Sequence, residues 1–311
     1  MSQKILITGG LGFQGSFITE NLLERGHDIT VLNTFSAEAE RNASFLAEKP
    51  RVVWGSVTDP EIVEKTVRAQ DTVIHLAGRI NVDESIRDPA AFLDANIWGT
   101  HNVLEAVRHH DARLIHASTC EVYGAPHERR LIHEGAEFRP HSPYAASKAA
   151  GDRLCFAYHR TYGTNITIVR PFNIYGERQK EDAGGAAIAI FTKRALAGEP
   201  IVIFGDGSQT RDYMHVSDAV QAYCDVVLPN ESLRGEAINF GTGKETSIRD
   251  IAEYVAKKLN AKIEYRAPRQ GEVKSFVAAD IAKARSLGFR PVVDIWAGID
   301  RYIEWRRQFP V

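Results

Sequence analysis

The stretch KILITGGLGFQG, residues 4–15, determines the fold class that we expect for this chain. Residues 4–8 are a short apolar run that predicts a buried strand, and residues 13–26 change to a helical spacing of apolar side chains. Phe13, Phe17, Leu22 and Leu23 are expected near one face of this helix. Between the two elements, glycines 9, 12 and 15 form a GxxGxxG pattern. Glycines in a strand–turn–helix let backbone N–H groups approach a pyrophosphate, so the stretch predicts a dinucleotide site rather than a turn needed only for packing.

Strands and helices continue to alternate after this stretch. We expect strands at 28–33, 51–54, 72–76, 113–118 and 165–170, and long helices at 89–110 and 143–162. Such alternation predicts an α/β protein with a doubly wound parallel sheet and helices on both faces. The elements beyond residue 170 are shorter: strands at 201–204 and 236–241, and helices at 186–198, 217–228, 247–259 and 294–307. We expect them to form a smaller, interleaved lobe, with strand 236–241 rejoining the main sheet.

Composition excludes several classes of function. The 311 residues carry a net charge of −2 with scattered basic residues, which argues against nucleic acid or an anionic membrane as partner. Cys120, Cys155 and Cys224 show no metal-binding spacing, so we expect no metal and free thiols in a reducing cytoplasm. No apolar run approaches the roughly 20 residues of a membrane helix. A strand begins almost at the N-terminus, so no signal peptide is expected before the fold.

The end of the second expected strand bears on which dinucleotide binds. An acidic residue there would hydrogen-bond the adenosine ribose, and this chain has Asn33 instead. Asparagine can still bond a hydroxyl, although it lacks the charge that repels a 2′-phosphate. Because no arginine adjoins Asn33, NAD is favoured over NADP.

The segment SPYAASK, residues 142–148, carries the residues expected to start the chemistry. Tyr144 and Lys148 are four apart on a predicted helix and therefore share one face. An ammonium near a phenol favours the phenolate, so we expect Lys148 to lower the pKa of Tyr144. Such a tyrosine can remove a proton from a sugar hydroxyl while hydride leaves the same carbon for a nicotinamide. The alternative is a surface YxxxK without function.

Seven segments, in order, make the chain similar to one known family: TGGLGFQG, HLAG, STCEVYG, YAASK, RPFNIYG, FGDGSQTRDYMHVSD and APRQGE. Together they resemble the extended short-chain dehydrogenase/reductase family of NAD-dependent nucleotide-sugar epimerases and dehydratases. The resemblance implies a Rossmann-type domain, tightly held NAD, a nucleoside-diphosphate sugar as substrate and a helix-paired homodimer. We assign residues 1–173 with 215–243 to the NAD-binding domain, and 174–214 with 244–311 to the nucleotide-sugar lobe.

The resemblance also implies roles for individual residues. Thr119 matches the hydroxyl that orients the tyrosine and the sugar oxygen, Tyr144 the acid/base, and Lys148 the residue that binds the nicotinamide ribose. The residues expected to bind the cofactor are Gly9, Gly12, Phe13, Gln14, Gly15, Asn33, Thr34, Ser56, Val57, Leu76, Ala77, Gly78, Asn96, Ser118, Tyr144, Lys148 and Pro171. Ser56 departs from the family, which often has an aspartate there that contacts adenine.

Five residues are expected to bind the substrate. Asn173 matches an amide that contacts the sugar, and Arg211 and Arg269 match groups that hold the diphosphate, which guanidinium can bind through paired oxygens. Phe204 and Glu272 complete the set. The alternative for each arginine is a solvated surface charge.

The middle of STCEVYG bears on which reaction follows the shared first step, oxidation of the sugar at C4 to a ketone. A 4-epimerase returns hydride to the other face and needs no further acid or base, whereas a dehydratase must remove the C5 proton and expel the C6 hydroxyl. Dehydratases resemble TDE here, glucuronate decarboxylases TSE, and a hexosamine 5,6-dehydratase type has a similar STCEVYG.

This chain reads Thr119-Cys120-Glu121, which favours a dehydratase with Glu121 as base, ahead of a 4-epimerase and then a decarboxylase. Cys120 takes the place of the acid. It can donate a proton, leave Glu121 to shuttle the proton alone, or be only a small buried apolar side chain. Glu121 itself can alternatively bond only a loop amide. A nucleotide-sensing binding protein is a further alternative, and the presence of both Tyr144 and Lys148 argues against it.

Overall fold

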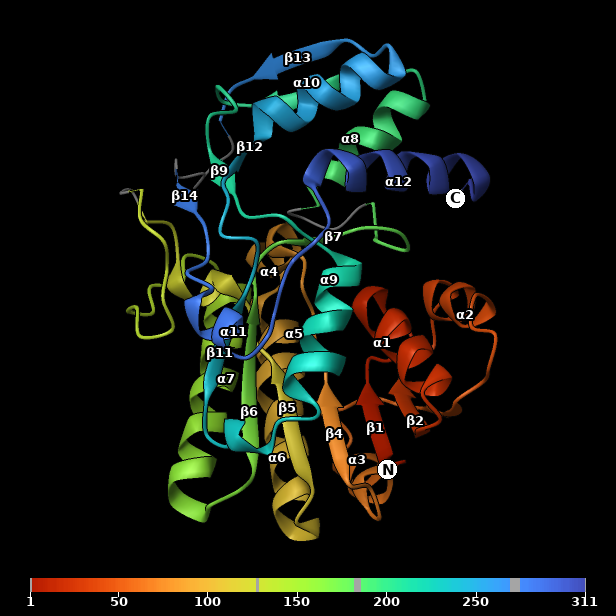
Figure 1. Cartoon of the computed structure of the whole chain (residues 1–311), viewed down its shortest axis with the longest axis vertical. Coiled ribbons are helices and arrows are strands. Elements are labelled where there is room, and N and C mark those ends of the chain that lie inside the picture. The colour runs from red at the N-terminus through yellow and green to blue at the C-terminus, as the bar shows by residue number, and fades with distance from the viewer. Residues whose placement is uncertain (1, 127–128, 182–185, 269–274, 311) are drawn as a thin grey trace.

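A seven-stranded parallel sheet forms the lower part of the molecule in Figure 1, a computed structural model that describes residues 2–126, 129–181, 186–268 and 275–310. From one edge to the other, the strands are β11 (Ala237–Phe240), β6 (Ile166–Pro171), β5 (Arg113–Ala117), β4 (Thr72–His75), β1 (Lys4–Thr8), β2 (Asp28–Asn33) and β3 (Arg51–Trp54). The order reverses between β1 and β4, and such a switch point is where open α/β sheets bind ligands, at the carboxyl ends of the strands. The predicted doubly wound, Rossmann-type sheet is confirmed, including the return of strand 237–240 to its edge.

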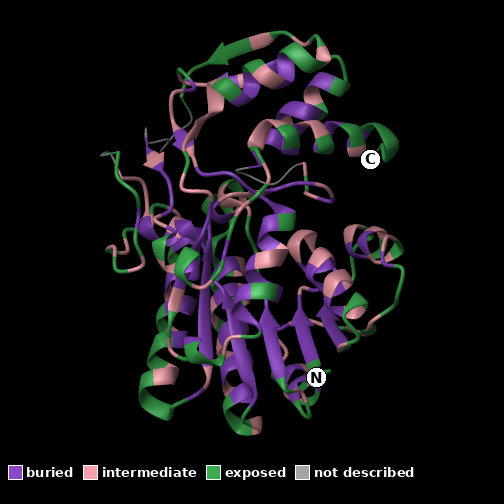
Figure 2. Cartoon of the chain, viewed as in Figure 1, coloured by how far each residue is buried: buried purple, intermediate pink, exposed green. Residues whose placement is uncertain are grey.

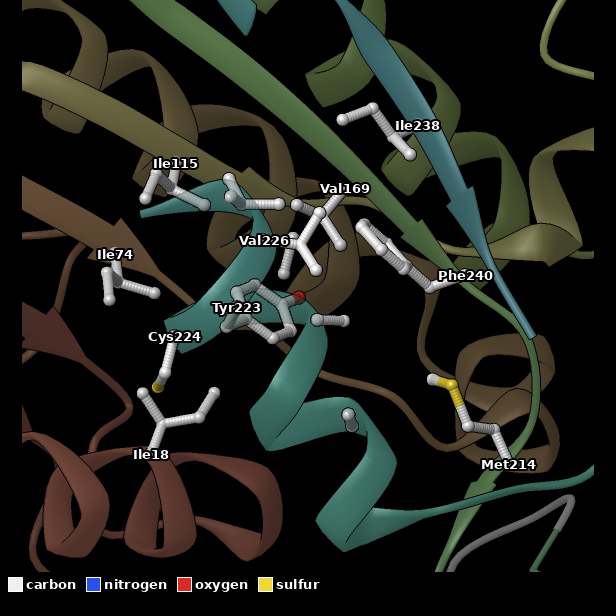
Figure 3. Close-up of a cluster of buried hydrophobic side chains, with 14 of the residues drawn as sticks. Ile18, Ile74, Ile115, Val169, Met214, Tyr223, Cys224, Val226, Ile238 and Phe240 are labelled. Carbon is white, nitrogen blue, oxygen red and sulfur yellow. The ribbon is translucent and has the colours of Figure 1, made fainter. Parts of the chain in front are cut away.

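Both faces of this sheet are covered by helices, so most of its strand residues are buried (Figure 2), whereas the edge strand β3 is partly exposed. Ile5 and Ile7 of β1 belong to the cluster under helices α1 (Phe13–Glu24) and α9 (Val216–Gln221), whereas Leu6 packs on the opposite face. In Figure 3, the π-helical turn η3 (Ala222–Val227) directs apolar side chains at the strands beside Ile18 of α1. Three helices cover the other face: α3 (Pro60–Val67), α6 (Gly99–His110) and α7 (Pro143–Tyr162).

Helix α7 has the bounds that the sequence predicts. The Ser142 hydroxyl accepts a hydrogen bond from the backbone N–H of Ala145, and Pro143 takes the first helical position, where its missing N–H costs no bond. Gly163, with φ +67°, ends the helix in the left-handed conformation that glycine adopts without strain. Local signals of this kind at both ends explain why the prediction succeeded.

Other helices differ from the predictions. In α1 the side chains of Ile18 and Leu22 are fully buried, while Phe13, Phe17 and Leu23 are only partly buried. The predicted apolar face is therefore correct for Leu22, whereas Ile18 was missed. The small residues of this helix face the sheet instead and allow close packing: Gly15, Ser16 and Thr19. The helix expected at 89–110 is divided into α5 (Pro89–Leu93), a π-helical turn η1 (Asp94–Trp98) and α6, and that at 217–228 into α9 and η3. Four further short α-helices in the described ranges had no predicted counterpart: α2 (Ala37–Ser44), α3, α4 (Val82–Arg87) and α11 (Ala282–Ser286).

The upper part of the molecule in Figure 1 has its own apolar cluster, which includes Phe191, Ile203, Val255 and Ile303. It consists of α8 (Ala187–Leu196), α10 (Ile248–Leu259), α12 (Ile295–Gln308) and the parallel pair β8 (Ile201–Phe204) and β13 (Ile263–Arg266). Short elements complete the chain: β7 (Ile174–Tyr175) paired with β10 (Met214–His215), β9 (Thr210–Arg211) between β12 (Thr246–Ser247) and β14 (Phe276–Val277), the 3₁₀ turns η2 (Cys120–Tyr123) and η4 (Glu231–Leu233), and α11 (Ala282–Ser286).

The segment around α11 returns to the main sheet, where Val277, Ala284 and Phe289 join the cluster of β11. Within the described ranges, no helix combines the length and the apolar character needed to cross a bilayer.

Candidate functional site

Thr119, Cys120 and Glu121 lie in a tight turn at the carboxyl end of β5. Thr119 is extended, with φ −162°, and its hydroxyl accepts a hydrogen bond from the backbone N–H of Glu121 at 3.3 Å. The turn η2 then ends at Gly124, with φ +77°, a conformation that favours glycine. The polar residues of STCEVYG therefore lie at the edge of the sheet where ligands bind in this fold class.

Helix α7 brings Tyr144 and Lys148 to the same place. Both are buried, with 8% of their surface exposed, and the Nζ of Lys148 donates to the carbonyl oxygen of Ala117 at 2.5 Å. A cleft of about 200 Å³ is lined by all five predicted catalytic residues: Thr119, Cys120, Glu121, Tyr144 and Lys148. The structure thus gathers side chains that are up to 29 positions apart in the sequence.

The expected effect of Lys148 on Tyr144 is not found. Burial raises the pKa of Tyr144 above its ordinary value, and the hydrogen bond with Thr119, which favours the phenolate, only partly offsets this. Burial also lowers the pKa of Lys148, to about 8. The ammonium is bound to the carbonyl of Ala117, so the prediction that it lowers the pKa of the phenol was wrong for this arrangement.

Cys120 is not suited to proton donation. Its side chain is 3% exposed, and burial, reinforced by the negative charge of Glu121, raises the pKa of the thiol well above its usual range. The amide Nδ2 of Asn173 lies 4.0 Å from the sulfur and donates to it. The thiol therefore keeps its proton and forms part of a packed wall.

A buried ion pair fixes the turn against helix α7. Arg170 of β6 donates through Nε and Nη2 to the two carboxylate oxygens of Asp152, at 2.8 and 3.0 Å, and both side chains are at most 2% exposed. Its Nη1 donates to the hydroxyl of Tyr123 at 2.8 Å, and that hydroxyl donates to Asn239. Strand β6, helix α7, turn η2 and strand β11 are thereby joined beneath the cleft.

The glycine loop has the geometry that a dinucleotide requires. Gly9 has φ +72°, and a side chain at Gly15 would collide with the carbonyl oxygen of Gly9. The Oδ1 of Asn33 accepts a hydrogen bond from the backbone N–H of Leu11 at 3.1 Å, and its Nδ2 donates to the carbonyl of Thr34. Asn33 therefore holds the loop in shape.

The cleft also contains polar atoms that suit a bound dinucleotide. Gln14 Oε1 and Ser118 Oγ are buried in its lining and have no hydrogen-bond partner among the described residues. Buried polar groups normally have partners, so a polar ligand fits here. Phe13, Leu76 and Pro171 line the same cleft. The other predicted cofactor residues lie in the glycine loop or follow β2, β3 and β4: Gly9, Gly12, Gly15, Asn33, Thr34, Ser56, Val57, Ala77 and Gly78.

Asn96, the remaining predicted cofactor residue, lies in the π-helical turn η1. The backbone N–H of Gly99 bonds to the carbonyl of Asp94, five residues earlier, which widens the helix at this point. The Oδ1 of Asn96 accepts from the backbone N–H of Arg79 at 2.8 Å, and its Nδ2 donates to the Ser147 hydroxyl at 2.8 Å. Asn96 thus ties the loop after β4 to helix α7.

A second, larger cavity of about 530 Å³ adjoins the cleft, and Glu121, Asn173 and Tyr213 line both. It contains three of the five predicted substrate residues: Asn173, Phe204 and Arg211. Arg269 and Glu272 lie outside the described residues. Sequence reasoning missed three basic residues in its lining: His141, Arg194 and Arg266. Of these, only His141 had a signal, because it directly precedes the SPYAASK segment.

Residues 5–241 match the NAD dependent epimerase/dehydratase family. The chain belongs to this family. It is 36% identical over 308 residues to a putative UDP-glucose 4-epimerase of Methanocaldococcus jannaschii, covering 97% of this chain and 98% of the relative. It is 34% identical over 319 residues to a dTDP-glucose 4,6-dehydratase of an Actinoplanes species, covering 98% of both.

Among solved structures, the UDP-glucose 4-epimerase of Thermus thermophilus in complex with NAD superimposes with a TM-score of 0.90. The two chains are 32% identical, with 99% of this chain and 100% of that chain covered. Membership confirms the predicted family, the enzymatic class and the NAD dependence. Both epimerases and dehydratases are among the relatives, so the family does not distinguish the two reactions.

Proposed function

We propose that this chain is an NAD-dependent nucleoside-diphosphate-sugar dehydratase that works through a 4-keto sugar. Tyr144 takes the proton of the C4 hydroxyl as the phenolate, the form that its hydrogen bond with Thr119 favours. Thr119 also orients that hydroxyl, and Lys148 holds the nicotinamide ribose. NAD, when bound, accepts a hydride from C4 and later returns it, which makes the reaction redox-neutral. The remaining cofactor residues of the glycine loop and strand ends keep their predicted roles in this proposal.

The position of Glu121 supports elimination. Glu121 lines both the cleft with Tyr144 and the larger cavity, which places it beside a sugar that reaches from one to the other in this proposal. The C4 ketone acidifies the C5 proton, and Glu121 removes it. Because burial raises the pKa of Cys120, we assign the proton transfer at C5 and C6 to Glu121 alone.

The larger cavity would hold the nucleotide. In this proposal Asn173 contacts the sugar, Phe204 lines the base pocket, and Arg211 binds the diphosphate together with Arg269 and Glu272. The Nη1 of Arg211 donates to the Ser275 hydroxyl at 2.8 Å, which orients the guanidinium at the cavity wall. Residues 174–214 and 244–311 form the substrate lobe in this assignment.

A 4-epimerase is the second candidate, because the Methanocaldococcus relative carries that name. It would use Thr119, Tyr144 and Lys148 in the same first step and leave Glu121 without a chemical task. A glucuronate decarboxylase is the third candidate and also starts with oxidation at C4.

Product analysis in D₂O separates these reactions. The protein is incubated with NAD and a panel of UDP- and dTDP-sugars, and the products are analysed by NMR and mass spectrometry. Loss of water with deuterium at C5 is expected. An unlabelled C4 epimer of unchanged mass would contradict the proposal in favour of the epimerase, and loss of CO₂ from UDP-glucuronate would favour the decarboxylase.

The variant Glu121→Gln tests the assigned base. We expect C4 oxidation to persist while elimination falls by about 10²–10⁴-fold, the usual contribution of a general base. Glu137→Gln is the control, because that carboxylate pairs with Arg139 on the surface and lies outside both cavities. Unchanged elimination in Glu121→Gln would remove this residue from the mechanism.

We also propose that the chain forms a homodimer through α5, η1 and α7, which contact one another. Leu93, Trp98, Phe156 and Tyr162 expose between 45% and 61% of their surface along these helices. Exposed apolar side chains that gather on one face are typical of protein interfaces. Sedimentation velocity should show a dimer that Phe156→Arg dissociates, and a wild-type monomer would contradict this assignment.

A cytoplasmic location remains a prediction.

A further inference from the structure

The elimination assigned to Glu121 leaves one requirement unmet. The C6 oxygen gains negative charge as its bond to carbon breaks, and a hydrogen-bond donor at that oxygen would stabilise it. We propose that the Nε2–H of His141 is this donor, an inference that rests on the proposed dehydratase function. His141 would then be a catalytic residue that the sequence motifs do not include.

The position of His141 brings it next to the base. It directly precedes Ser142, the N-cap of α7, and lines the larger cavity together with Glu121 and Gly124. The backbone N–H of Arg139 donates to the carbonyl of Val122 in turn η2 at 3.0 Å, so the segment that carries His141 is bonded to the turn that carries Glu121. A side chain next to Glu121, the base that removes the C5 proton, therefore lies on the C5–C6 side of the bound sugar.

Hydrogen bonding fixes where the imidazole proton is. The backbone N–H of Ala125 donates to Nδ1 of His141 at 3.2 Å, so Nδ1 must carry a lone pair. The single proton of a neutral imidazole is then on Nε2. Nε2 makes no hydrogen bond within the described residues, and His141 is one of the residues that line the cavity. His141 therefore offers a donor to a ligand there, not a second acceptor.

The bond from the backbone N–H of Ala125 also positions the His141 ring against the turn at Gly124. Gly124 permits the close packing: a Cβ there would lie 2.6 Å from Nδ1 of His141 and would collide with the carbonyl of Arg139. The ring is thus held in one tautomer by a turn that excludes side chains.

Other polar groups also lie near Glu121. The Thr119 hydroxyl accepts from the backbone N–H of Glu121 and interacts with Tyr144, and the Ser142 hydroxyl accepts from the backbone N–H of Ala145. Cys120 is shielded and bonded by the Asn173 amide. The wall next to His141 includes the apolar Val82 and Ile86. The hydroxyls of Ser142 and Tyr213 also line the cavity, and we assign the donor role to His141 because the bond from Ala125 fixes its ring.

The step balances without another reactant. Glu121 takes the C5 proton, and the electron pair of the C5–H bond passes into the enolate of the C4 ketone. From the enolate this pair forms the C5=C6 bond as the C6–O bond breaks. The departing oxygen takes the proton back from Glu121 and leaves as water. His141 donates a hydrogen bond to that oxygen throughout and keeps its own proton, so no charge is left on the imidazole.

Three variants of His141 and a matched control test the proposal in the full-length protein with NAD and the sugar that it dehydrates. His141→Ala and His141→Phe remove the donor, whereas His141→Gln restores an N–H. His133 is the control, because its Nδ1 also accepts a backbone N–H, from Gly135 at 3.2 Å, and it lines neither cavity. C4 oxidation is followed by nicotinamide absorbance, C5 exchange by deuterium uptake and elimination by loss of water.

We expect His141→Phe to oxidise C4 and exchange the C5 proton at nearly wild-type rates while losing water about 100-fold more slowly, as when one oxyanion donor is removed. The C5-deuterated 4-keto sugar should accumulate. His141→Ala should behave alike, His141→Gln should recover most of the rate, and His133→Ala should match the wild type.

Two results would overturn the inference alone: wild-type loss of water in His141→Phe, or an equal loss of C4 oxidation and elimination in a folded variant, which indicates a structural role. If the wild type gives only an unlabelled C4 epimer, both this inference and the proposed function fail.

Discussion

The cleft around Tyr144 and the larger cavity around Arg211 are built in different ways. The cleft lies at the carboxyl ends of the sheet strands. Its Tyr144 and Lys148 are buried, and the buried ion pair of Arg170 and Asp152 joins the elements beneath it. The cavity is larger and is lined from short strands and surface helices. Groups that react must be held closely, whereas groups that only bind can be exchanged between relatives. The predictions below test this difference.

Tyr144→Phe should have the largest effect. Removal of the phenolic oxygen removes the proposed acid/base, so C4 oxidation should fall by about 10²–10⁴-fold with the fold intact. The rise of reduced nicotinamide in a single turnover measures this step. Tyr158→Phe on the same helix is the control, because its hydroxyl bonds Glu105 away from the cleft. Normal C4 oxidation by Tyr144→Phe would show that the cleft is not the reaction centre.

Asp152→Asn should destabilise the region beneath the cleft. Burial alone would raise the pKa of this carboxyl, but hydrogen bonds from Arg170 and Arg153 hold it below its usual value. Without the anion, Arg170 keeps a buried charge, which typically costs about 3–5 kcal/mol of unfolding free energy. Urea unfolding measures this change.

The matched variant in the upper part of the molecule is Asp300→Asn. It breaks a pair with Lys258 whose two side chains are 43% and 46% exposed, so its effect should be small. Equal effects of the two substitutions would contradict the contrast between the two regions.

Arg211→Met should affect binding more than chemistry. Hydrogen bonds to charged groups contribute about 1.5–3 kcal/mol, so KM should rise by about tenfold to a hundredfold while kcat changes less. Steady-state kinetics separates the two constants. Arg249→Met is the control, because Arg249 bonds the carbonyl of Asp206 and lies outside the cavity lining. A fall in kcat alone would place Arg211 in the chemical step.

A change of pH near neutrality should have the smallest effect on the rate of C4 oxidation. Burial lowers the pKa of Lys148 to about 8, so its side chain is cationic below that pH and neutral above it. If the ammonium is the active form, C4 oxidation should be level below pH 8 and fall about tenfold per pH unit above it. Single-turnover rates between pH 6 and 10, at saturating NAD, measure the profile. A rate that rises through this range would show that the neutral amine is the active form.

The sequence predicted the elements whose determinants are local. Helix α7 has a capping serine, a proline at its first position and a terminal glycine, and its predicted bounds are those of the structure. The five catalytic side chains were predicted to lie together, and they do line one cleft, because the carboxyl ends of parallel strands share one edge.

Features set by packing were not predictable. Apolar spacing alone could not show that the small residues of α1, rather than Phe13 and Phe17, face the sheet. The pKa of Tyr144 depends on burial and on the direction of the Lys148 ammonium, which no i, i+4 spacing specifies. His141 lines the cavity because of a turn at Gly124, 17 positions earlier in the chain.

The wide turn η1 limits how this chain can change length. A π-helical turn contains one residue more than the α-helix around it, and here that residue brings Asn96 against Ser147. Deleting one residue from 94–98 would restore ordinary winding and rotate the following side chains by about 100°. The helix would survive, but the link from the loop after β4 to α7 would be lost. Insertions and deletions in related sequences should therefore avoid this turn and occur in surface loops instead.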